Sequence, residues 1–117
     1  MTKKINADQY MPFYEFLFFD PLYRKMSDKA KILYTYLRNT LKFFEHENER
    51  YKHEEGLKSY FDENGDLFVI ADNIELCYIL NCSEPTLIKT KKEIARYGLL
   101  EELRKKDKPN QIYPLKP

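Results

Sequence analysis

The sequence predicts an α+β fold in which helical segments are followed by a short terminal hairpin. Three observations favour it: an apolar stripe at three- and four-residue steps after Ser27, capped helix starts in the second half, and two β-type segments near the end. With 117 residues the chain has room for one domain with a real hydrophobic core. Three glycines against ten tyrosines and eight phenylalanines argue for a compact chain.

Residues 1–26 are predicted to form an extended aromatic arm. Within it, YMPFYEFLFFDPL at 10–22 is interrupted by Pro12 and closed by Asp20-Pro21, and proline blocks a continuous helix. A lone strand cannot bury so many aromatic rings, so they pack either on this domain's own core or on a second copy of the chain. The arm residues expected in such a dimer contact are Tyr10, Phe13, Phe16, Phe18 and Phe19.

The first long helix is predicted over residues 27–44, with Ser27 as its N-cap. Its apolar stripe consists of Ala30, Leu33, Tyr34, Leu37, Leu41 and Phe44. Over residues 45–59 the charges crowd and the apolar period weakens, which predicts a loop with, as an open alternative, a helical extension at its start. The segment at 62–66, DENGD, supplies the residues of a tight turn.

The second half predicts a strand, two short helices and a hairpin. The strand is 67–70, LFVI, and Asp72 or Asn73 then caps a helix that ends near Leu80. Ser83 opens the next helix, over 84–97, with Pro85 in its first turn. Gly98 suits the left-handed position after a helix. Strands at 99–103 and 111–115 flank a polar turn.

Two short helices, the tight turn between them and a hairpin are the plan of a winged helix-turn-helix, here predicted over residues 27–117. In that plan the second helix enters the DNA major groove and the hairpin is the wing. Helical spacing turns Leu87, Ile94 and Ala95 inward. The predicted reading surface of the helix is Thr86, Lys89, Thr90, Lys92 and Arg96, and the predicted phosphate contacts of the wing are Arg104, Lys105, Lys106 and Lys108.

These residue types suit duplex DNA. Lys and Arg reach phosphate oxygens and guanine acceptors, and Thr offers a hydroxyl and a methyl group, whereas Glu84 and Glu93 would repel phosphate. Lys91 lies nearer the core side by helical phase, so it would bury its stem and bring its amine to the surface. Whether Lys91 contacts DNA stays open. Lysines on any one helix are usually only its solvated face, and the prediction therefore depends on finding a basic helix and a basic hairpin together.

Charge and motifs exclude several other classes. The net charge of +1 hides two basic ends and an acidic middle: residues 1–44 carry eight Lys/Arg against four acids, 45–75 three against ten, and 76–117 nine against five. Asp62, Asn64 and Asp66 begin a calcium-loop pattern that then fails, because Leu67 stands where glycine is needed. His46 and His53 lack metal-ligand partners, and Cys77 and Cys82 form no CxxC. We expect no metal, no cofactor, no enzymatic activity, no membrane span and a cytoplasmic location.

Six motifs, in order, resemble the N-terminal domain of RepA_N plasmid replication initiators. They are MSDKAKILYTYL at 26–37, DENGD at 62–66, Asn81-Cys-Ser83 with Thr86, Lys91-Lys-Glu-Ile94, Gly98-Leu-Leu100, and Lys108-Pro-Asn110 with Ile112-Tyr113. The resemblance implies a winged-helix dimer that binds repeated origin sequences of low-copy plasmids in Gram-positive bacteria and helps to recruit host replication proteins. It puts the DNA-binding helix at 84–97 and the wing at 104–110, which adds Asn110.

The chain also departs from this family's pattern. It has a charged insertion before the 62–66 turn, no tryptophan, and Lys106-Asp107 where the family's wing usually has glycine. Complete family members continue into a further domain, so we expect an excised N-terminal domain. Two alternatives remain at this point: a winged-helix transcriptional regulator, and a protein-interaction module that recruits replication proteins without touching DNA.

Overall fold

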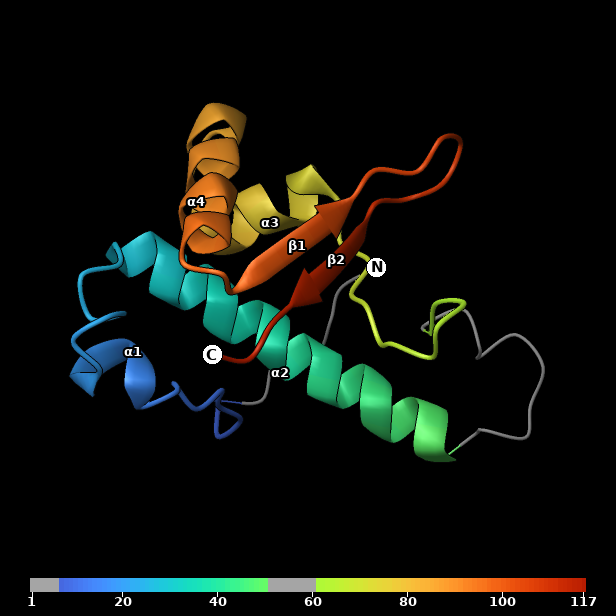
Figure 1. The fold of residues 1–117 in the computed structure, drawn as a ribbon, viewed down its shortest axis with the longest axis horizontal. Helices are drawn as coiled ribbons and strands as arrows, with labels where there is room; N and C mark the ends of the chain where they lie inside the picture. The colour runs from blue at the N-terminus through green and yellow to red at the C-terminus, as the bar shows by residue number, and fades with distance from the viewer. Residues whose placement is uncertain (1–6, 51–60) are drawn as a thin grey trace.

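The computed structural model describes residues 7–50 and 61–117, except for the side chains of residues 43–50. Its elements are α1 (Phe16–Phe19), α2 (Asp28–Arg50), α3 (Asn73–Leu80), α4 (Glu84–Arg96), β1 (Leu100–Leu103) and β2 (Gln111–Pro114). In Figure 1 the long helix α2 runs beneath α3, α4 and the hairpin, and α1 lies beside the N-terminal half of α2. The predicted α+β class is confirmed.

The core lies where α2, α3, α4 and the hairpin meet. Helix α2 contributes Leu33, Tyr34 and Leu37, all fully buried, and their three- and four-residue spacing places them on one face of the helix. Leu76 comes from α3, and Leu87 with Ile94 from α4. Because α4 contacts α2, α3 and β1, its inner face is fixed by three neighbours, and its remaining residues point outward.

Helix α2 begins where the sequence predicted and ends later. The hydroxyl oxygen of Ser27 accepts a hydrogen bond from the backbone N–H of Ala30 at 3.2 Å, as expected of an N-cap. The helix continues to Arg50, so the open alternative of a helical extension into the charged segment is confirmed. Glu and Arg are good helix formers, so a helix can continue where the apolar period weakens. The rest of the predicted loop, at 51–59, lies outside the described residues.

The arm is not fully extended, contrary to the prediction. Phe16–Phe19 form one helical turn, which fits between Pro12 and Pro21 without placing either proline inside it. Leu17 of this turn is fully buried, and the ring of Phe16 packs edge-on against Tyr34 at 5.8 Å between centroids. This part of the arm therefore packs on the chain's own core.

The two strands of the hairpin are antiparallel, with Leu100 opposite Pro114 and Leu103 opposite Gln111, within one residue of the predicted bounds. The strand predicted at 67–70 is reduced to single bridges: Val69 exchanges backbone hydrogen bonds with Ile112, and Leu67 pairs with Phe61. Between Phe61 and Leu67 the chain turns tightly, and Asp62 Oδ1 accepts N–H groups of Asn64 and Asp66. Pairing at alternate positions is too sparse to extend into a third strand.

Candidate nucleic-acid interface

Both ends of α4 are formed as the sequence predicted. Ser83 is the N-cap, its side chain accepting the N–H of Thr86, and Pro85 lies in the first turn, where an amide hydrogen is not needed. Tyr97 is the C-cap, and Gly98 follows it with a φ of 76°, a backbone conformation that costs glycine little. The helix therefore starts and stops within one residue of the predicted 84–97.

The outward face of α4 carries three basic side chains of the predicted reading surface. Lys89, Lys92 and Arg96 are exposed. Thr86 is half-buried at the first turn, where its hydroxyl lies 3.1 Å from that of Ser83. First-turn N–H groups favour an anion, so this end of the helix suits a phosphate.

The predicted helical phase was wrong at two positions. Thr90, expected outward, is only 5% exposed, and its hydroxyl donates to the carbonyl oxygen of Thr86 at 2.8 Å. Ala95, expected inward, is exposed, as is Ile88. Positions 88, 92 and 95 share the face of Lys89 and Arg96 by three- and four-residue steps. The helical spacing could have placed Ile88 and Ala95 on the exposed face, but their apolar side chains favoured a buried position.

Glu93, the acid expected to repel phosphate, binds the start of α2 instead. Its two carboxylate oxygens accept hydrogen bonds from the backbone N–H and the hydroxyl of Ser27, both at 2.7 Å. The positive end of the α2 dipole adds to this stabilisation of the negative charge. Glu93 thus ties α4 to α2 and is turned away from the open face.

The β1–β2 loop carries the second group of basic side chains. Arg104, Lys105, Lys106 and Lys108 are all exposed. Asp107 has a φ of 63°, in the left-handed region that favours glycine. Asn110, at the end of the loop, is half-buried, and its Nδ2 donates to Glu102 Oε2 at 3.0 Å.

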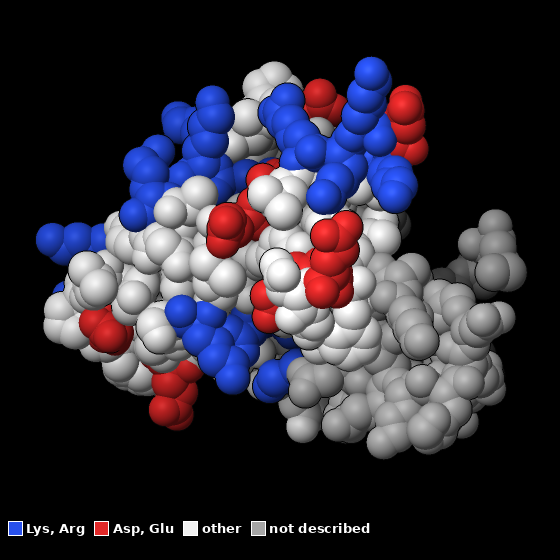
Figure 2. All heavy atoms as spheres, turned by 45° about the vertical axis from the view of Figure 1, so that its right-hand side comes forward, with Lys and Arg blue, Asp and Glu red and all other residues white. Residues whose placement is uncertain are grey.

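Figure 2 shows how these charges gather on the surface. Lys and Arg side chains form two groups along the upper edge of this view, over α4 and over the β1–β2 loop, with uncharged and some acidic atoms between them. The two groups belong to elements that follow each other directly, because β1 begins soon after α4 ends.

Lys91 is not part of the exposed basic face. It is 8% exposed, and its Nζ donates to Asn73 Oδ1 and to Glu102 Oε2. The prediction that Lys91 lies on the core side is confirmed, but its amine ends in a partly buried polar contact rather than free at the surface. The sequence offered no sign of Glu102 as its partner, since the two residues lie on different elements.

The other arm residues of the predicted dimer contact lie on the surface. Tyr10, Phe13 and Phe19 are 86%, 52% and 77% exposed, and Phe18 is exposed as well, with its ring edge-on to Phe13. Phe16 alone of the five is partly buried. Beside Phe13 a hollow of about 510 Å³ opens between the arm, α2 and α3, lined in part by Ile32, Tyr36 and Tyr78.

Other chemistry has little support in the residues that the structure describes. Over 7–50 and 61–117 no group of three His, Cys, Asp or Glu side chains is placed to hold a metal ion. Cys77 and Cys82 are free thiols. No described helix combines the length and the apolar character needed to cross a membrane. His46 and His53 fall among the residues whose side chains are not described.

Comparison with known proteins gives one family and several similar structures. Residues 9–116 match the model of the replication initiator protein A (RepA) N-terminus. A structure described as the N-terminal domain of a DNA-binding protein is 26% identical with a TM-score of 0.72, covering 100% of this chain and 86% of the other. A Rep–DNA complex is 28% identical with a TM-score of 0.69, covering 94% and 76%. No curated protein sequence matches.

A third similar structure, described as an MDR initiator, is 27% identical with a TM-score of 0.70, and covers 98% of this chain and 87% of the other. The fold and these likenesses define the class: an N-terminal domain of a replication initiator. The chain belongs to the RepA_N family, as its match over nearly the full length shows.

Proposed function

We propose that this domain binds double-stranded DNA in a sequence-specific manner at repeated sites of a replication origin, and thereby initiates plasmid replication. The observation that carries the proposal is the exposed basic face of α4 next to an exposed basic loop. Two positively charged surfaces on adjacent elements suit the negatively charged phosphate backbone, which supplies much of the affinity for DNA. The likeness to a Rep protein in complex with DNA supports the same function.

The proposed architecture is a winged helix-turn-helix over residues 27–117. Helices α3 and α4 are joined by Asn81, Cys82 and Ser83, and the hairpin follows α4 directly. Asn81 takes the left-handed conformation, with a φ of 51°, and so turns the chain from one helix into the next. With this connectivity α4 is the recognition helix in the major groove, and the β1–β2 loop is the wing along the neighbouring backbone.

Each exposed residue of α4 has a role in this proposal. Lys89, Lys92 and Arg96 contact phosphates or guanine acceptors, and Thr86 holds a phosphate at the helix start. Ala95 and Ile88 contact thymine methyl groups, because small apolar side chains suit that contact. Thr90 is left out because it is buried. The wing contacts phosphates through Arg104, Lys105, Lys106 and Lys108.

We further propose that the domain acts as a homodimer through the arm, residues 1–26. The support is the exposure of Tyr10, Phe13 and Phe19 together with the hollow beside Phe13. Exposed aromatic rings of this number on one segment indicate an interaction surface. A twofold assembly also matches repeated DNA sites, since protein symmetry sets half-site spacing. In this proposal the initiator also has host replication proteins as partners. It acts on plasmid DNA in the bacterial cytoplasm.

Selection of bound duplexes from a random pool tests the proposed function. The expected result is enrichment of one motif, present as repeats in the origin of the plasmid that encodes the chain. Enrichment of a motif found only at promoters would indicate a transcriptional regulator instead. If no duplex is enriched and a replication protein is recovered by pull-down, the domain is a protein-interaction module and the proposal fails.

A further inference from the structure

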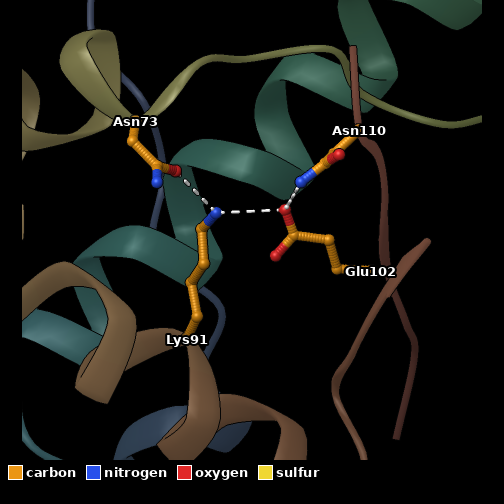
Figure 3. Close-up of polar contacts among 4 residues, drawn as sticks. All are labelled: Asn73, Lys91, Glu102 and Asn110. Carbon is orange, nitrogen blue, oxygen red and sulfur yellow. Dashed lines mark hydrogen bonds and ion pairs between the residues drawn. The ribbon is translucent and has the colours of Figure 1, made fainter. Parts of the chain in front are cut away.

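A partly buried network of four polar side chains joins α4 to the hairpin (Figure 3). Lys91 Nζ donates to Asn73 Oδ1 at 3.0 Å and to Glu102 Oε2 at 3.2 Å, and the same Glu102 oxygen accepts Asn110 Nδ2 at 3.0 Å. The four residues come from different places in the chain: the first turn of α3, the middle of α4, strand β1, and the residue before β2. One carboxylate oxygen thus links the helix pair to both sides of the hairpin.

The ion pair at the centre of the network is largely, but not fully, shielded from water. The side chains of Lys91 and Glu102 are 10% and 22% exposed. A buried ion pair adds little net stability compared with apolar side chains of the same size, because both charges lose their hydration. Its geometry is nevertheless specific, since the ammonium group must meet both of its acceptors at hydrogen-bond distance. A contact of this kind fixes a relative position more than it stabilises the fold.

The network lies where it can fix the direction of the β1–β2 loop. Glu102 and Asn110 lie at the base of the β1–β2 loop, just inside and just outside the last strand pair, Leu103 with Gln111. Beyond this base the basic side chains of the loop extend into solvent, and within the described residues they make no ion pair. The polar contacts of Glu102 and Asn110 at this base therefore hold the direction of the loop relative to α4.

We infer that Lys91 is a positioning residue of the DNA interface. It does not touch DNA; through Glu102 and Asn110 it holds the basic loop at a fixed angle to the exposed face of α4, so that both reach the same duplex at once. The inference rests on the proposed function for its use in DNA binding. The orientation of the loop itself is a property of the free domain and can be measured without DNA.

Two variants separate positioning from stability. Lys91→Met leaves Glu102 partly buried without its cation, so this variant is expected to lower the melting temperature. Lys91→Met/Glu102→Leu replaces both partners by apolar side chains and is expected to melt close to the wild type. The loop variant Lys105→Ala/Lys106→Ala/Lys108→Ala is the matched comparison, because it removes the charges that the network is inferred to direct.

Residual dipolar couplings of the free domain test the orientation. In the wild type, the couplings of residues 104–110 are expected to fit the alignment of α4. In Lys91→Met/Glu102→Leu they are expected to fall towards zero while those of α4 are unchanged. Wild-type loop couplings already near zero, or loop couplings retained in the double variant, would overturn the inference whether or not the domain binds DNA.

Salt titration of duplex binding tests whether the loop needs the network in order to contact phosphates. The slope of log K against log salt is expected to fall in Lys91→Met/Glu102→Leu by about 0.9 for each phosphate that the loop no longer neutralises. Adding the three loop substitutions to this variant should cause no further fall. A full further fall would show that the loop still binds without the network, and would overturn the inference. Absence of wild-type binding contradicts the proposed function, and the couplings then decide the positioning alone.

Discussion

At the residue scale, the carboxylate of Glu93 is an interhelical cap. It accepts two hydrogen bonds from Ser27 at the start of α2, and charge-assisted bonds of this kind are stronger than neutral ones. Glu93→Gln keeps the size of the side chain and removes its charge. We expect the free energy of unfolding to fall by about 1 kcal/mol, the difference between a charged and a neutral acceptor.

Urea denaturation measures the effect of Glu93→Gln. The control is Glu101→Gln, because Glu101 is exposed on β1 and forms no ion pair with the described residues. The control should unfold like the wild type. Equal stability of both variants would show that Glu93 does not cap α2.

Tyr113 and Asp62 form a pair with opposite pKa shifts. Backbone hydrogen bonds, chiefly from Asp66, lower the pKa of Asp62, and the Tyr113 hydroxyl donates to its Oδ2 at 2.9 Å. Burial, followed by the contact with Asp62, raises the pKa of Tyr113 from 10.0 to about 12. The Asp62 contribution to stability is present above its unfolded pKa and lost as pH falls through the lowered folded pKa. The Tyr113 contribution is present below pH 10.0 and lost as pH rises towards about 12.

We therefore expect Tyr113→Phe to lose stability at neutral pH and to show a smaller further loss between pH 10 and 12 than the wild type. The pKa of the Asp62 carboxyl should rise towards its usual value, as followed by carboxyl NMR titration. Tyr78→Phe is the control, since that ring is 87% exposed. If the stability of Tyr113→Phe falls at alkaline pH as much as that of the wild type, the alkaline loss does not come from Tyr113.

At the element scale, local chemistry made several bounds predictable. Asp72 and Ser83 accept first-turn N–H groups, and Gly98 has a positive φ, so α3 begins, and α4 begins and ends, where these residues indicate. The end of α2 was not predictable from the apolar period, because that period reports burial rather than helicity. The network around Lys91 could not be predicted either, since it depends on how four separate segments meet in space.

The helical turn of the arm and the phase of α4 show a further limit of sequence patterns. Pro12 and Pro21 exclude a long helix but leave room for the single turn at Phe16–Phe19. In α4, polar character suggested an exposed Thr90 and small apolar character a buried Ala95. The hydroxyl of Thr90 is satisfied by the helix's own backbone, which lets it be buried, and a methyl group costs little at the surface.

The β1–β2 loop provides the prediction at this scale. Asp107 combines a positive φ with a negative charge among four basic side chains. Asp107→Gly removes both the backbone cost and the charge, so it should raise the free energy of unfolding by up to about 1 kcal/mol and tighten duplex binding. Asp107→Asn removes only the charge and should tighten binding with little change in stability. Weaker binding in both variants would contradict the proposed contact between this loop and phosphates.

At the scale of the whole molecule, the exposed aromatic rings of the arm predict self-association. We expect the wild type to sediment at twice the monomer mass at micromolar concentration, and Tyr10→Ser/Phe13→Ser to sediment as a monomer, because burial of exposed aromatic surface drives association. Ile70→Ser, a change at an exposed apolar residue outside the arm, should leave the mass unchanged. A monomeric wild type would contradict the proposed dimer.

The salt dependence of duplex binding tests the central claim, that the exposed face of α4 binds DNA. Compared with the wild type on the selected duplex, Lys89→Ala/Lys92→Ala should lose binding at about 0.15 M salt and show, at lower salt, a slope of log K against log salt reduced by about 2. The control Lys42→Ala/Lys116→Ala makes the same change in net charge outside α4 and the loop, and should keep the wild-type slope. Equal affinity and slope in the wild type and Lys89→Ala/Lys92→Ala would contradict the account.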